Sequence, residues 1–296
     1  MIAATTAGML RKSLAAEKGY SIMKKMKKLA ALLLAAGMMM GMAACTSAPA
    51  ASDTTGESST TSTAGESSID KIKASGKIIM ATNAQFEPFE YIDGTDYKGI
   101  DIEISQKIAD ELGVELEIHD VKFESVIAEI TTGKANFAAA GMSVTPERLE
   151  NVDFSNEYFS ATQSILVMKE GSSVAKPEDL KGKVVGVQTG TTADTYVTDK
   201  DGENNVGVKE VKRYNSFVDA VNDMITGRLD AVVMDDFPAN KLVEKNADKI
   251  MKLEDELTGE KYAIAVPKGD KEMQDLVNKV LADMEESGEM DELLTK

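Results

Sequence analysis

The order of apolar patterns along residues 69–296 is the feature that most constrains the fold of this chain. Short apolar runs, typical of buried strands, alternate with segments whose apolar residues recur every three or four positions, typical of amphipathic helices. In one such segment Ile100, Ile104, Ile108 and Leu112 share a face, and Gly113 predicts the end of the helix. Strands are predicted at 77–82, 114–118, 137–140, 183–187, 208–213, 229–234 and 262–267.

This alternation forms two blocks, with an apolar run at 165–168 between them, and predicts two α/β lobes with mainly parallel sheets. Ligands of such sheets bind beyond the carboxyl ends of the strands. Four loops at these ends carry polar or aromatic groups: NAQF, AGMSVTPER, QTGTT and MDDF. We therefore expect a ligand site where these four loops meet.

The loop AGMSVTPER contains Arg148, one of only three arginines after residue 45. A guanidinium is favoured over an ammonium where planar, bidentate contact with a carboxylate is needed. The small residues Ala140, Gly141 and Ser143 allow backbone groups to approach a ligand closely. The alternative is a plain strand-to-helix connection, in which Thr145 caps the helix, a proline takes its first position and Arg148 faces solvent. Capping by Thr145 and binding by Arg148 are compatible.

The loops QTGTT and MDDF offer hydroxyls, an amide and carboxylates. Gln188, Thr191 and Thr192 lie at the predicted start of a helix, which suits a carboxylate or phosphate, but the lysine and spacing of a nucleotide P-loop are missing. Asp235 and its neighbour suit a metal, acid–base chemistry, an ammonium group or a helix cap. We predict no metal and no cofactor, because the single histidine, His119, lies in another strand and no calcium-type loop is present.

Two aromatic residues, Phe86 and Phe123, are expected next to the site. Either they pack in the core, which is the common role of phenylalanine, or they enclose the side chain of a ligand.

Residues 23–44 have the organisation of a bacterial signal sequence. Four lysines precede an apolar segment, 29–42, that is shorter than the roughly 20 residues of a membrane span. Two alanines then lead to Cys45, the only cysteine in the chain. The pattern resembles a lipoprotein signal, in which Cys45 becomes the first residue after cleavage and carries lipid, including palmitate. The alternative is an ordinary secretory signal with an incidental free thiol.

The segments around this signal have different compositions. Residues 1–22 are predicted to be an upstream extension, because translation is expected to start at Met23. Residues 45–68 are almost all Ser, Thr, Ala, Gly and acid, and predict a flexible tether. The net charge of −17 argues against binding to the phosphates of a nucleic acid and predicts a solvated acidic surface.

Taken together, the motifs ATNAQFEPFEY, GIDIEI, AGMSVTPER followed by VDFS, VVGVQTGTT, DAVVMDD and YAIAVPKG resemble the extracellular solute-binding proteins of family 3, the polar amino-acid receptors of ABC importers. The likeness covers about residues 69–296. It implies a type II periplasmic-binding-protein-like fold, with two α/β sheets joined by two hinge strands and a ligand cleft between them. Lobe 1 would comprise residues 69–162 and 261–296, and lobe 2 residues 163–260.

The resemblance also implies the roles of the loop residues. The α-carboxylate of an amino acid would contact Arg148, the Ser143 region and the Thr192 amide, and its α-ammonium would contact Asp235 and the backbone at Gly141. The aromatic and amide side chains would surround the ligand's own side chain. The implied ligand-binding residues are Asn83, Phe86, Phe123, Ala140, Gly141, Ser143, Arg148, Gln188, Thr191, Thr192 and Asp235.

One departure from the family concerns specificity. Receptors for cationic amino acids often have an acid where this chain has Asn83, which weakens a lysine or arginine assignment. Glu87 either restores an acid to the pocket or faces solvent. The expected ligand is accordingly glutamine-like or basic.

The leading hypothesis is a monomeric, non-enzymatic protein, anchored by lipid to the extracellular face of the cell membrane, that delivers a polar L-amino acid to ABC permease subunits. One alternative is a ligand-sensing lipoprotein that signals to a separate membrane partner. The other is a small-carboxylate dehydratase on the same fold, in which Glu87 is the candidate acid or base.

Overall fold

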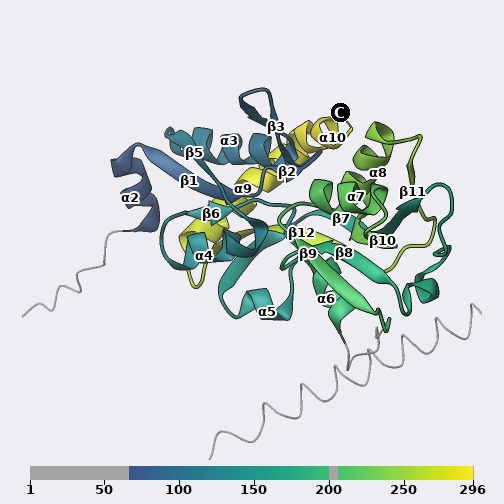
Figure 1. Ribbon diagram of the computed structural model, residues 1–296. Coiled ribbons are helices and arrows are strands. Elements are labelled where there is room, and N and C mark those ends of the chain that lie inside the picture. Colours follow the sequence, from purple (N-terminus) through teal and green to yellow (C-terminus); the bar gives the residue numbers. More distant parts are fainter. Residues whose placement is uncertain (1–66, 200–205, 296) are drawn as a thin grey trace, which may run out of the picture. The chain divides into compact units, whose positions relative to one another are not determined.

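The computed structural model describes residues 67–199 and 206–295 (Figure 1). The predicted extension 1–22, the predicted signal sequence 23–44, Cys45 and the predicted tether up to residue 66 lie outside these residues. The end of the tether is predicted slightly too late, because Ser67 caps helix α2 (Ser68–Ser75) by accepting a hydrogen bond from the Asp70 amide at 3.4 Å. Ser68 is also fixed, since its hydroxyl donates to Asp270 at 2.9 Å.

The first lobe has three parallel strands in the predicted order. Strand β1 (Lys77–Thr82) lies between β5 (Glu115–Asp120) and β6 (Phe137–Ala138) and is parallel to both. The crossovers contain α3 (Ile100–Leu112), the 3-10 turn η2 (Phe123–Ser125) and α4 (Val126–Thr131). As predicted, α3 ends where Gly113 takes a left-handed conformation (φ 69°). Strand β6 ends at Ala138 and not at residue 140, because the chain turns toward Gly141, whose φ is 49°.

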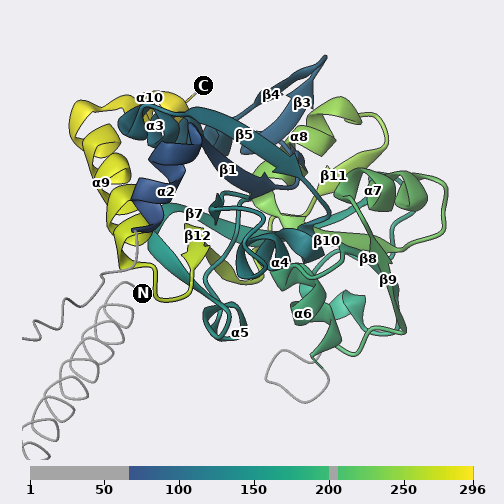
Figure 2. The same ribbon diagram turned by 90° about the vertical axis from the view of Figure 1, so that its left-hand side faces the viewer.

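Helices α9 (Lys271–Ser287) and α10 (Glu289–Leu294) return to this lobe, where α9 contacts α2, α3 and the strands β7 and β12, and α10 contacts α9 (Figure 2). The periodic face predicted for α3 is buried against them. Ile78, Ile104 and Val277 are fully buried, so apolar burial fixes these helices on the sheet.

The second lobe repeats the arrangement. Strand β8 (Val184–Gln188) lies between β9 (Glu210–Tyr214) and β10 (Ala231–Asp235) and is parallel to both. Its helices are α6 (Thr192–Thr198), α7 (Phe217–Ile225) and α8 (Asp236–Lys245), with the 3-10 turn η3 (Pro177–Leu180) before β8. The three strands predicted for this lobe, at 183–187, 208–213 and 229–234, are confirmed, with ends that differ by one or two residues.

Two antiparallel strands connect the lobes. Strand β7 (Val152–Met168) pairs with β12 (Gly259–Pro267) up to Thr162, and from Gln163 onward it pairs with β10 and then with β11 (Ile250–Lys252). The hydrogen-bonded path therefore runs β5-β1-β6-β12-β7-β10-β8-β9 through both lobes. From the sequence, only the apolar run at 165–168 indicates β7. The earlier part of this strand contains many polar residues at exposed or partly exposed positions and shows no apolar run.

A small antiparallel sheet was not expected from the sequence. It consists of β2 (Gln85–Phe86), β3 (Glu90–Asp93) and β4 (Asp96–Lys98), which are too short to show a clear alternation. This sheet positions Phe86 and Glu90 near the ends of the first-lobe strands.

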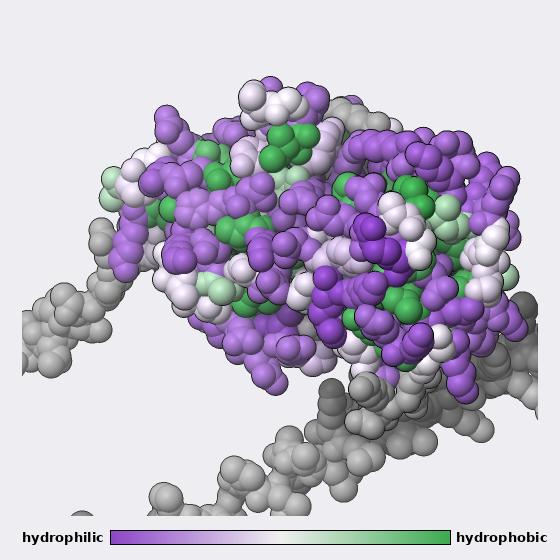
Figure 3. Space-filling view, viewed as in Figure 1, coloured by the Kyte–Doolittle hydropathy of each residue, from purple (hydrophilic) through white to green (hydrophobic). Residues whose placement is uncertain are grey.

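The face in Figure 3 is mainly hydrophilic, with small, separate hydrophobic areas. His119 lies in β5 with its ring nitrogens near Glu117 and Glu129, at 3.0 and 3.2 Å. Within the part of the chain that the structure describes, no helix is long and apolar enough to cross a membrane.

Candidate ligand-binding site

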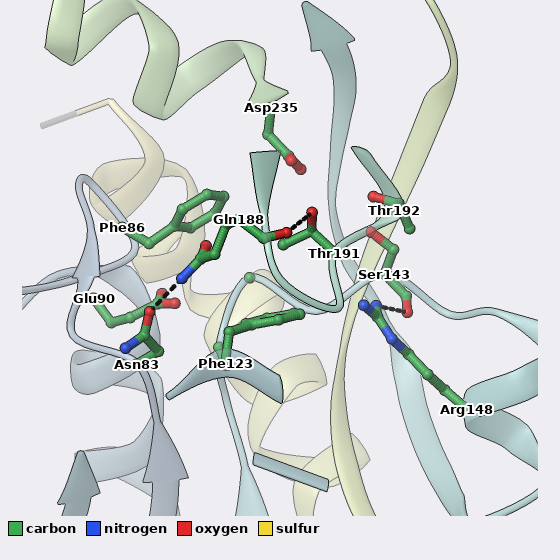
Figure 4. Close-up of a pocket in the computed structure, with 12 residues that line it drawn as sticks. Asn83, Phe86, Glu90, Phe123, Ser143, Arg148, Gln188, Thr191, Thr192 and Asp235 are labelled. Carbon is green, nitrogen blue, oxygen red and sulfur yellow. Dashed lines mark hydrogen bonds between the residues drawn. The ribbon is translucent and has the colours of Figure 1, made fainter. Parts of the chain in front are cut away.

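Residues from both lobes line one pocket (Figure 4). The four strand-end loops meet here, as the sequence predicts, and all eleven predicted residues line the pocket, together with Glu90. The lining residues are Asn83, Phe86, Glu90, Phe123, Ala140, Gly141, Ser143, Arg148, Gln188, Thr191, Thr192 and Asp235. Contact of these residues with a ligand remains a prediction.

Arg148 lies on one side of the pocket, in the short helix α5 (Pro146–Leu149). Thr145 caps this helix by accepting a hydrogen bond from the Arg148 amide at 3.2 Å. The guanidinium donates from Nη1 to the Ser143 carbonyl (2.7 Å) and from Nη2 to the Gly190 carbonyl of the other lobe (3.1 Å). Arg148 is only 8% exposed, so the alternative with Arg148 in solvent is wrong.

The environment of the guanidinium suits an anion. Its Cζ lies 5.3 Å from the centroid of the Phe123 ring, and burial lowers the pKa of Arg148. The acids Glu260, Asp235 and Glu147 act to raise this pKa, but both printed hydrogen bonds of the guanidinium go to neutral carbonyl oxygens, which favours a negatively charged ligand as a further partner.

The backbone conformation and the neighbouring Phe86 ring explain why a glycine is needed shortly before Arg148. Gly141 has a φ of 49°, and its amide donates to Oδ2 of Asp101 at 2.8 Å. A Cβ at this position would lie 2.6 Å from Cε1 of Phe86. Only glycine therefore allows the backbone and the Phe86 ring to share this wall of the pocket.

The loop after β8 contributes amide and hydroxyl groups. Gln188 donates from Nε2 to Oδ1 of Asn83 across the lobes and to the Asn215 carbonyl, both at 2.8 Å. The Thr191 hydroxyl donates to the Gln188 carbonyl (2.9 Å) and accepts from the Asp194 amide, which caps α6. Thr192 accepts a hydrogen bond from Gln163 at 3.1 Å.

Asp235 lies on another side of the pocket, at the end of β10. It stands at the N-cap position of α8, as the helix-cap alternative predicts, but its side chain makes no capping hydrogen bond. Instead, its carboxylate accepts hydrogen bonds from the Tyr262 hydroxyl and from Nε2 of Gln163 (2.6 Å). Burial raises the pKa of Asp235 to about 7, although both hydrogen bonds act to lower it. A cation in the pocket would restore its charge.

Glu90 is the pocket residue that sequence reasoning missed. It is 1% exposed on β3, and burial raises its pKa well above the usual range, with a further increase from neighbouring Asp101. Glu87, the acid considered from the sequence, forms an ion pair with Lys245 of α8 and lines a different hollow. The only sequence signal for Glu90 was an acid between two aromatic residues in the run FEY.

The pocket presents a guanidinium and two carboxyl groups but no cluster of metal-ligating side chains among residues 67–199 and 206–295. A charged pocket between two α/β lobes, joined by paired strands, defines a two-lobed solute-binding protein. The chain belongs to the bacterial extracellular solute-binding proteins of family 3, whose family model matches residues 78–296. The fold class expected from the sequence is confirmed.

Three similar proteins illustrate the relationship. The arginine-binding extracellular protein ArtP of Bacillus subtilis (strain 168) is 34% identical over 221 residues, which cover 74% of this chain and 85% of ArtP. The arginine-bound form of truncated ArgBP from T. maritima has 39% identity and a TM-score of 0.68, covering 73% of this chain and 99% of that one. An ancestral arginine-binding protein bound to glutamine has 37% identity and a TM-score of 0.69, covering 74% and 96%. By name, all three are binding proteins and not enzymes.

Proposed function

We propose that this protein captures an L-amino acid with a cationic side chain, arginine first, and delivers it to the permease of an ABC transporter. The observation that carries the proposal is the charge pattern of the pocket: a buried guanidinium on one side and buried carboxyl groups on two others. An amino acid with a cationic side chain carries one negative and two positive groups, so its charges complement this pattern.

Arg148 would bind the α-carboxylate. A guanidinium has five N–H groups, and Arg148 uses two of them on backbone carbonyls, which leaves three for a bidentate contact. Ser143 and Thr192 line the pocket beside it and would complete the carboxylate site. Asp235 would bind the α-ammonium together with the backbone at Gly141.

Glu90 supplies the acid that Asn83 does not. The presence of Asn83 weakened the expectation of a cationic ligand, but Glu90 lines the same pocket. Phe86 and Phe123 offer aromatic faces to the aliphatic part and the head of a guanidinium. The names of the relatives, which include arginine-binding proteins, support the same ligand class. Glutamine is the second candidate, because Asn83 and Gln188 can exchange hydrogen bonds with an amide.

The remaining parts of the proposal concern architecture and location. Lobe 1 is assigned to residues 69–162 and 261–296 and lobe 2 to 163–260, which the change of partner of β7 at Thr162 and Gln163 supports. The protein would act as a monomer on the extracellular face of the cell membrane. Cys45 would be its lipid anchor after removal of the signal sequence 23–44.

Calorimetric titration with each of the twenty amino acids tests the ligand class. We expect arginine to bind at least about tenfold more tightly than any neutral amino acid, a difference of about 1.4 kcal/mol. Absence of binding below millimolar concentration for all twenty would refute the proposal.

Two experiments test the partner and the anchor. Stimulation of a reconstituted transporter ATPase by the loaded protein distinguishes delivery from the signalling hypothesis. Replacement of Cys45 by Ala should release the protein from the membrane fraction, whereas retention there would argue against lipidation.

A further inference from the structure

Two buried carboxyl groups lie close together beside the pocket. Glu90 on β3, which lines the pocket, is 1% exposed and Asp101 on α3 is 0% exposed, and after burial itself the charge of Asp101 is the next largest cause that raises the pKa of Glu90. Asp101 already accepts hydrogen bonds on both oxygens, from the Tyr158 hydroxyl at 2.6 Å and from the Gly141 amide at 2.8 Å. Burial raises the pKa of Asp101 to about 6, but two donors stabilise its carboxylate, so the negative charge of the pair is favoured on Asp101 and the proton on Glu90.

Other features of the surroundings of Glu90 also favour its protonated form. Its Oε2 has no hydrogen-bond partner within the described residues, and Glu90 lines the pocket. Burial is the main reason why the pKa of Glu90 is raised, and nearby acids on several elements add to it. The titratable groups that face it are Asp101 on α3, Asp120 on β5, Asp235 on β10, Tyr158 on β7 and Tyr262 on β12. The pocket's cation, Arg148, lies on the opposite side in Figure 4.

We propose that Glu90 holds a removable proton, which lets one pocket accept either a cationic or an amide side chain. A guanidinium at Glu90 would expel this proton to solvent and pair with the resulting carboxylate, so that the total charge of this part of the site stays constant. The amide of glutamine would leave the proton in place and accept a hydrogen bond from it. This inference rests on the proposed function and adds how the pocket recognises two ligand classes.

Proton release is therefore expected to differ between the two ligands. The α-ammonium of any amino acid would also displace a proton from Asp235, whose pKa is about 7. Because both ligands carry the same α-ammonium, the difference between them isolates Glu90. By linkage, the affinity for arginine relative to that for glutamine should fall as pH decreases, by up to about tenfold for each pH unit in the range where Glu90 is protonated in the ligand-free protein.

Calorimetric titration at one pH in two buffers of different ionisation enthalpy measures the protons released. We expect arginine to release about one proton more than glutamine, since one carboxyl group changes its state. Glu90→Gln, which imitates the protonated acid, should abolish this difference. It should also weaken arginine binding at least tenfold while glutamine binding stays within about threefold.

Glu87→Gln is the matched control, because Glu87 lies outside the pocket and pairs with Lys245. It should leave the difference in proton release intact. Equal proton release for the two ligands in the unmodified protein, or a difference that survives in Glu90→Gln, would overturn this inference while the proposed function stands. Failure of both amino acids to bind would instead overturn the proposed function.

Discussion

Replacement of Arg148 by Ala is the most direct test of how the pocket holds an amino acid. The three N–H groups that Arg148 does not use internally allow two hydrogen bonds to the ligand carboxylate. Hydrogen bonds to charged groups contribute about 1.5–3 kcal/mol each, so the variant should lose about 3–6 kcal/mol of binding free energy. That corresponds to a decrease in arginine affinity of about 100-fold to about 20,000-fold.

The same substitution should affect folding much less. It removes a buried charge, whose desolvation opposes folding, along with the contact to Phe123 and two bonds to carbonyl groups. We expect a net change near 1 kcal/mol, or about 2–4 °C in the melting temperature of the ligand-free protein. The effect on binding should therefore exceed the effect on stability by at least about 2 kcal/mol.

Titration calorimetry with arginine and thermal unfolding without ligand measure the two effects. Arg228→Ala provides a matched control, because Arg228 is 58% exposed at its side chain and pairs with Asp223 away from the pocket. An affinity of Arg148→Ala within tenfold of the unmodified protein would refute the role of Arg148. Unfolding of the variant at room temperature would instead show that the guanidinium is chiefly structural.

Three further predictions follow from the same geometry. Gly141→Ala should weaken arginine binding at least about tenfold, because the new Cβ displaces Phe86. Gly133→Ala is the control: Gly133 also has a positive φ, but a Cβ there meets no neighbour. This control should lose about 1–2 kcal/mol of folding stability and keep its arginine affinity. Titration and unfolding of both variants separate the two effects. Because the folded-state pKa of Asp235 is about 7, above its usual value of 3.8, the melting temperature of the ligand-free protein should fall as pH rises from 5 to 8. The decrease in melting temperature with pH should be smaller in Asp235→Asn, and an equal decrease in both proteins would show that Asp235 does not cause it. Glu87→Gln should change arginine affinity by less than about fivefold, because an exposed ion pair contributes at most about 1 kcal/mol.

Much of the fold follows from local patterns. The helix α3 is an example: four apolar residues at spacings of four and a glycine at the end are sufficient to predict both its buried face and its last turn. Strand β7 shows the limit, because its length depends on pairing with β12 and β10, which are distant in sequence. Polar residues at exposed positions of such a strand carry no local strand signal.

The sequence by itself determined which loops form the site. Parallel strands bring their carboxyl ends to one edge of a sheet, so residues such as Arg148, Gln188 and Asp235 could be assigned to a common pocket from strand order. Only the tertiary structure decided which acid enters the pocket, Glu90 and not Glu87, and that Asp235 faces Tyr262 and Gln163 instead of capping α8. The physical reason is that the orientation and the ionisation of a buried side chain depend on neighbours far away in the chain, whereas strand and helix patterns depend mainly on neighbours nearby.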